Sequence, residues 1–133
     1  MFDVEAYVFD KVEQEVKTAM PEVIILPSLE QQPPHFPCLA FYEADNRTYQ
    51  DSQLGDGTDH HISVMYTAEA FSVSEQGGKY QCKQILSIVD DVMRRMGFQR
   101  TANVGIDNYD RTVSRRVARY TGVVGENGIV YRQ

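Results

Sequence analysis

The sequence has few of the residues that small disulfide-bonded or metal-stabilised domains depend on. It contains two cysteines, three histidines and no tryptophan among 133 residues. One pair of cysteines cannot build the dense disulfide framework of small secreted domains. We expect Cys38 and Cys82 to be small buried hydrophobic residues, and a reducing cytoplasm is the simpler setting for them.

Long apolar runs are absent too. None approaches the roughly 20 residues that a membrane-spanning helix requires. The chain begins with an acidic, amphipathic segment at residues 1–5, and no basic stretch with an apolar core precedes it. We therefore expect neither a membrane span nor a signal peptide.

Motifs of catalytic sites are missing. The sequence contains no G-x-S-x-G turn, phosphate-binding loop or dinucleotide fingerprint. Gly77 and Gly78 before an expected helix are only a weak signal for an anion site. His60 and His61 are adjacent on an expected strand, so they point to opposite faces and are poorly placed to share a metal ion. A small metal-dependent hydrolase using these histidines is the weaker alternative, and we expect no enzyme activity and no cofactor.

Two pairs of carboxylates stand out as candidates for acid–base chemistry. Glu43 and Asp45 are two positions apart on an expected strand and so should share a face, whereas Asp90 and Asp91 are adjacent on an expected helix. Paired carboxylates perform acid–base work only when they are buried or converge. Solvated surface charge is the simpler interpretation of both pairs.

The spacing of apolar residues predicts a single α+β domain over residues 1–133. The spacing predicts one helix over residues 2–20, which ends at Pro21, and a second over 79–96, which Gly97 ends as a C-cap. Residues 44–59 are rich in Asp, Asn, Ser and Gly, and we expect a long exposed loop there. Strands are predicted at 22–26, 38–43, 60–73, 98–106, 111–124 and 129–131. The order favours a mostly antiparallel β-sheet with two α-helices packed against it.

Charge is unevenly distributed along the chain. Residues 1–93 carry five Lys/Arg and sixteen Asp/Glu, a net charge of −11, whereas residues 94–133 carry eight Arg and three Asp/Glu, a net charge of +5. Unlike surfaces of identical chains that meet head to tail build rings. The basic part lacks the interleaved aromatic residues of single-strand nucleic-acid binders. A solvated strand face is the simpler interpretation of the arginines taken alone.

The arginines of the last long strand are candidates for a contact between subunits. On a strand, Arg115 and Arg119 point one way and Arg116 the other. Arginine pairs with carboxylates in bidentate geometry and is enriched at interfaces. The competing interpretation is an edge strand guarded by charge. The candidate interface residues are Arg111, Arg115, Arg116, Arg119, Glu43, Asp45 and Asp56.

Three segments, in order, cover nearly the whole chain. The first is FPCLAF at 36–41 with EADN at 43–46. The second is the long strand, the glycine turn with Lys79, and the helix that ends in MGFQR at 96–100. The third is NYD at 108–110 followed by RRVARY at 115–120. Together they resemble the tail-terminator family of long-tailed phages, also labelled tail-completion or minor capsid proteins. One departure is FSV at 71–73, where relatives often carry Tyr-Ser-Asn.

The resemblance implies a structural role in virion assembly. A small α+β protein of this family forms a hexameric ring that caps the tail tube, ends tail polymerisation and joins the tail to the head. The implied partners are other copies of the chain, the tail-tube protein and a head–tail connector or neck protein, with no membrane and no sequence-specific nucleic acid. The implied location is the host cytoplasm during assembly, then the head-proximal end of the tail. A different neck or head-completion component is the alternative.

Overall fold

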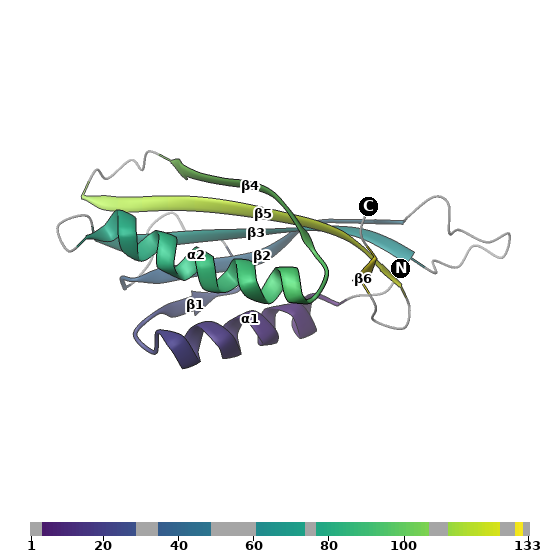
Figure 1. The fold of residues 1–133 in the computed structure, drawn as a ribbon, viewed down its shortest axis with the longest axis horizontal. Helices are drawn as coiled ribbons and strands as arrows, with labels where there is room; N and C mark the ends of the chain where they lie inside the picture. The colour runs from purple at the N-terminus through teal and green to yellow at the C-terminus, as the bar shows by residue number, and fades with distance from the viewer. Residues whose placement is uncertain are drawn as a thin grey trace, which may run out of the picture.

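The computed structural model of the chain describes residues 4–28, 35–48, 61–73, 77–106, 112–125 and 130–131. These residues form two helices and six strands (Figure 1). None of the helices in these ranges is long and apolar enough to span a membrane. In chain order the elements are α1 (Glu5–Ala19), β1 (Ile24–Leu26), β2 (Cys38–Thr48), β3 (His61–Val73), α2 (Gly78–Arg95), β4 (Gln99–Ile106), β5 (Val113–Gly125) and β6 (Val130–Tyr131).

The strands form one sheet in the order β1-β2-β3-β5-β4, and β6 also pairs with β5. Only the short β1–β2 pair is parallel, and the other pairs are antiparallel. The two longest strands, β3 and β5, lie side by side in the middle of the sheet. The predicted α+β fold with a mostly antiparallel sheet is confirmed.

Both helices cover the same face of the sheet (Figure 1). Because side chains alternate along a strand, the even-numbered residues of β3 and β5 face the helices. Members of this set such as Tyr66, Ala68, Ala118 and Tyr120 are all buried in the main core. The odd-numbered residues of the same strands lie on the opposite face, which we call the open face.

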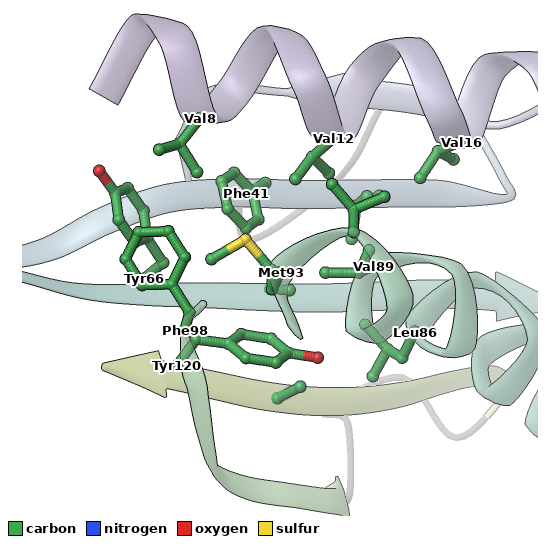
Figure 2. Packing of buried hydrophobic residues seen from close by; sticks show 14 of the residues in the cluster. Val8, Val12, Val16, Phe41, Tyr66, Leu86, Val89, Met93, Phe98 and Tyr120 are labelled. Atoms are coloured by element: carbon green, nitrogen blue, oxygen red, sulfur yellow. The ribbon is translucent and has the colours of Figure 1, made fainter. Parts of the chain in front are cut away.

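The helices form where the sequence spaces apolar residues by three and four. Val8, Val12 and Val16 of α1 point down onto the sheet, and Leu86, Val89 and Met93 of α2 enter the same core (Figure 2). Burying one such side chain stabilises the fold by roughly 1.5–3 kcal/mol. Gly97 ends α2 as predicted, directly after the cap residue Met96, because it has φ 101° and the Phe98 N–H donates to the Met93 carbonyl at 3.0 Å.

Three aromatic rings fill the centre of this core. Phe41 stacks on Tyr66 with ring centroids 5.5 Å apart, and Phe98 meets Tyr66 edge-on, also at 5.5 Å (Figure 2). Such pairs add about 0.5–1.5 kcal/mol beyond the burial of their area. The rings come from β2, β3 and the segment after α2, so they join the sheet to the helix layer.

The prediction of a loop over 44–59 is wrong for its first part. Strand β2 continues through Thr48, because residues 45–48 pair in register with β3. The polar composition misled the sequence interpretation, since backbone pairing in a sheet does not require apolar side chains. A register shift between Glu43 and Asp45 marks a β-bulge there. The rest of that loop and the turns predicted at 107–110 and 125–128 lie wholly or mostly outside the described residues.

The competing interpretation of the arginine-rich strand as an edge strand is also wrong. Strand β5 pairs with β3 along one side and with β4 along the other. Its arginines therefore belong to an interior strand, where they act through their contacts with neighbouring side chains.

A glycine at the start of α2 allows the helix to approach β3. A Cβ atom at Gly78 would lie 2.7 Å from the backbone oxygen of Val73 and 3.0 Å from Ser114 Oγ. We expect Gly78→Ala to lower the free energy of unfolding by about 1–3 kcal/mol, the usual cost of overpacking. Urea denaturation at one fixed protein concentration measures this.

The matched control is Gly105→Ala in β4, where the nearest atom would be Arg116 NH1 at 3.7 Å. We expect it to leave stability within about 0.5 kcal/mol of wild type. Equal losses at both positions would contradict the tight approach at Gly78.

Candidate interface and polar clusters

A buried ion pair lies on the open face between β3 and β5. The side chain of Arg115 donates through Nε at 3.0 Å, and also through NH2, to Oε1 of Glu69, which is 2% exposed. The Tyr42 hydroxyl donates to the other carboxylate oxygen at 3.2 Å. The Arg115 guanidinium also lies 5.6 Å from the centroid of the Phe71 ring. Both carboxylate oxygens are thus satisfied within the chain.

One of the predicted interface residues, Arg115, belongs to this cluster. Arg115 pairs with Glu69 inside its own chain, and the sequence predicted neither Glu69 as the partner of Arg115 nor Tyr42 as a second donor to Glu69. The available signal was Glu69 itself, the only charged residue between positions 62 and 73. Burying an acid in a strand requires a counter-charge on the same face. The sequence did not show that β5 would be the strand beside β3.

The remaining arginines are placed as the alternation predicted. Arg116 is on the helix side of β5 and donates from Nε to Asn103 Oδ1 at 2.6 Å and from NH2 to the Asn103 carbonyl at 3.3 Å. Arg119 is exposed on the open face, and its side chain makes no hydrogen bond or ion pair within the described ranges. Arg111 lies outside the described residues. A subunit contact through these arginines stays a prediction.

The acidic candidates do not share a face. Glu43 lies opposite Tyr66 on the helix side, whereas Asp45 lies opposite Met65 on the open face. The bulge between them inserts one residue and reverses the alternation, so the prediction of a shared face is wrong. Asp56 lies outside the described residues.

These two acids also differ in their contacts. Glu43 accepts a hydrogen bond from the buried Tyr66 hydroxyl at 3.0 Å, and its backbone N–H donates to Glu5 Oε2 at 2.9 Å. Asp45 has a side chain that is 37% exposed and pairs with Arg47 at 2.6 Å. Glu43 therefore helps to hold α1 on the sheet, whereas Asp45 is accessible to solvent.

A second polar cluster lies beneath the end of α2. Asp90 accepts hydrogen bonds from the Tyr120 hydroxyl at 3.1 Å and Arg100 NH1 at 3.3 Å, and Arg94 NH1 lies 3.6 Å from its second oxygen. Burial, with the nearby Asp90 carboxylate, raises the pKa of Tyr120. Asp90 is only 9% exposed. The interpretation of Asp90 as solvated charge is wrong, whereas the neighbouring Asp91 is exposed.

Both cysteines are buried thiols, as predicted. The Cys82 thiol lies 3.4 Å from the Ala70 carbonyl and 3.5 Å from the Ser114 carbonyl, where it can donate one weak hydrogen bond. Burial raises the pKa of Cys82 to about 11. A thiol protonated in this way is a poor nucleophile at neutral pH.

No metal-binding group is found among the described residues, where no three or more His, Cys, Asp or Glu side chains gather. His35 is exposed. His60 and the side chain of His61 lie outside the described part of the chain. Glu69 and Asp90 each bind arginine and tyrosine side chains of the same chain, so both clusters act as structural contacts.

Comparison with known proteins does not add a family assignment. No protein-family model matches the sequence, and no curated protein shows significant similarity to it.

Loss of Arg115 should destabilise the fold strongly. Arg115→Met leaves the Glu69 carboxylate buried without its counter-charge, which typically costs about 3–5 kcal/mol. Urea unfolding of the variant at neutral pH measures the loss. Arg119→Met on the same face is the matched control, and we expect its stability within about 0.5 kcal/mol of wild type. Similar stability of the two variants would contradict the dependence of the buried Glu69 carboxylate on Arg115 as its counter-charge.

The pKa of Cys82 predicts a loss of stability at alkaline pH. From about pH 9, the ordinary pKa, the unfolded thiol releases its proton, while the folded thiol retains it to about pH 11. The free energy of unfolding should therefore fall over this range, by about 1–2 kcal/mol from this group. Cys82→Ala should remove this part of the decrease. Tyr42 and Tyr120, whose pKa values are also raised, contribute equally in both proteins.

Urea titrations at pH 8.5 and 10.5 supply the comparison. An identical pH dependence in wild type and Cys82→Ala would refute the proposed burial effect on the thiol.

Proposed function

We propose that this chain is a structural assembly protein that caps a phage tail tube, ends tail polymerisation and joins the tail to the head. The specific assignment rests on the resemblance of its three ordered segments to the tail-terminator family. The fold is of the class that this resemblance implies. The residues that could have formed a reaction centre in the described part are instead paired with one another.

The observation that carries the proposal is the open face of the sheet. Both helices cover the other face, and no described element lies over this one (Figure 1). At the β4 end of the open face Val104 is 52% exposed and Ile106 is 38% exposed, with Arg119 also exposed nearby. Exposed apolar side chains beside a charge are typical of a protein–protein contact.

The internal ion pairs support an assembly role. The contacts of Glu69 with Arg115 and of Asp90 with Tyr120 and Arg100 tie β3 to β5, and α2 to both β5 and β4. They fix the strands and the helix relative to one another. A rigid sheet with one face left open suits a component that must present the same surface in each copy of a ring.

A different neck or head-completion component would use the same kind of surface for another partner. Binding separates the two roles: a tail terminator captures the tail-tube protein, whereas a neck component captures the portal or adaptor protein. Pull-down with each purified partner distinguishes them.

The proposal predicts the consequence of removing the gene from the phage or prophage that carries it. Without a terminator the tube continues to polymerise, so tails should become longer and variable in length and should lack heads. Electron cryo-microscopy of lysates measures the tail lengths. Restoring the gene on a plasmid is the control and should return a single length. Tails of normal, uniform length in the deletion strain would exclude tail termination.

A further inference from the structure

One edge of the sheet is open to a further strand. Among the described strands β4 pairs only with β5, and Figure 1 shows it as the outermost strand on that side. Natural proteins usually guard such an edge with charges, prolines or a very short strand. Residues 102–106 of β4 contain neither a charge nor a proline, and Val104, Gly105 and Ile106 are exposed. The outer backbone groups of this stretch can therefore pair with an extended segment of another chain.

The opposite edge of the sheet is guarded. Strand β1 spans only the three residues Ile24–Leu26, and Pro27 follows it directly. Beyond β1, the outer side of β2 carries the bulge after Glu43 and the charged pair of Asp45 and Arg47. Short strands, prolines, bulges and charges all oppose pairing with another chain. Of the two edges, β4 is the one suited to accept a strand.

Arg116 reaches over β4 on the helix side of the sheet. Its Nε and NH2 groups donate to Asn103, and a Cβ atom at Gly105 would lie 3.7 Å from its NH1. Because Gly105 has no side chain, the guanidinium can lie over the backbone of the edge strand. Asn103 is neutral, so no acid within the described residues compensates the charge of Arg116.

Arg119 supplies a second uncompensated charge, on the open face. It is exposed, and its side chain makes no hydrogen bond or ion pair within the described ranges. Its register partner in β4 is the small Ala102. An exposed arginine beside a small residue can turn towards an acid on a strand beyond it. Small residues of β4 thus leave both arginines access to the edge, one on each face.

The side chains of an added strand would meet different surroundings at each position. Such a strand would lie about 5 Å from β4 and about 10 Å from β5, a distance that Arg and Glu side chains span together. An acid opposite Gly105 would meet Arg116, and an acid opposite Ala102 would meet Arg119. Opposite Val104 and Ile106, apolar side chains would extend the exposed apolar surface of the open face.

These positions define a sequence pattern for the partner. Antiparallel pairing is slightly the more stable, so the added strand reads apolar, acidic, apolar, any residue, acidic from its N-terminus. This chain has acids three positions apart at three places, and none has apolar residues on both sides of the first acid: Asp10 with Glu13, Asp56 with Asp59, and Asp107 with Asp110. The occupant that fits the edge is therefore a segment of a different protein.

We propose that β4 is a docking edge for an extended acidic segment of a partner protein, which adds to the sheet as an antiparallel strand with this pattern. Backbone hydrogen bonds supply the attachment, and the two arginines select the acids. This inference rests on the proposed assembly role, and it specifies the chemistry of a partner segment that such a role requires.

A synthetic peptide tests the docking edge on the whole protein. The probe is the acetylated and amidated peptide TVEVTET, titrated to millimolar concentration and followed by amide chemical shifts in NMR spectra. We expect the largest shifts at residues 102–106. The peptide TVKVTKT should bind about tenfold more weakly, because both attractive ion pairs become repulsive.

Methylation of the peptide backbone tests strand pairing itself. Backbone groups of alternate residues in an added strand face β4, and the others face solvent. TVEVTET N-methylated at its second valine and TVEVTET N-methylated at the following threonine should therefore differ. We expect one form to lose binding and the other to keep it. Equal affinities of the two forms would contradict pairing as a strand.

A charge exchange tests the register. Arg119→Glu should prefer TVEVTKT to TVKVTET, although the two peptides have the same composition, because only the first places lysine opposite Ala102. The matched control is Lys83→Glu on the exposed side of α2, which makes the same change of charge. We expect it to bind TVEVTET as wild type does. Thermal unfolding verifies that both variants are folded.

The outcomes separate this inference from the proposed function. If TVEVTET does not bind, if its shifts lie outside β4, or if Arg119→Glu does not discriminate the two exchanged peptides, the docking edge is wrong. The tail lengths of the deletion strain then still decide whether the chain terminates tails. Normal tails in that strain, together with binding at β4, would reject tail termination and leave the docking edge supported.

Discussion

Strands β3 and β5 pair antiparallel without a break from His61 opposite Gly125 to Val73 opposite Val113. This pairing fixes which side chains of both strands face the helices and which face away. It places Tyr66 opposite Tyr120 in the core and brings Glu69 within reach of Arg115 on the other face. A shift of β5 by one residue would turn Arg115 and Arg119 towards the helices and Tyr120 to the open face.

The two polar clusters have the same physical logic on opposite faces of the sheet. Glu69 and Asp90 are nearly buried acids, and each is satisfied by a tyrosine hydroxyl and an arginine. Removing a partner from such a group costs more than the pair contributes, because a charge is then left buried. The clusters therefore specify the arrangement of the elements more than they increase stability, and they leave the outer edges available for contacts.

The edges of the sheet connect the fold to the proposed assembly. Acidic α1 and β2 precede the long central strand in the chain, and basic β4 and β5 follow it, so the order of strands turns a charge difference along the sequence into one across the molecule.

The sequence by itself determined the fold class, both helices, the Gly97 cap and the two faces of the arginine-rich strand, because these follow from local spacing and backbone preference. It failed to predict the bulge after Glu43, because a single inserted residue creates this bulge and leaves no signal in the composition. It also failed at Asp90, whose burial depends on elements distant in the chain, and it did not show that Arg115 would pair with Glu69. Only the tertiary structure decided that β5 is interior and that β1 and β4 form opposite ends of the sheet, since strand order results from pairing between distant segments.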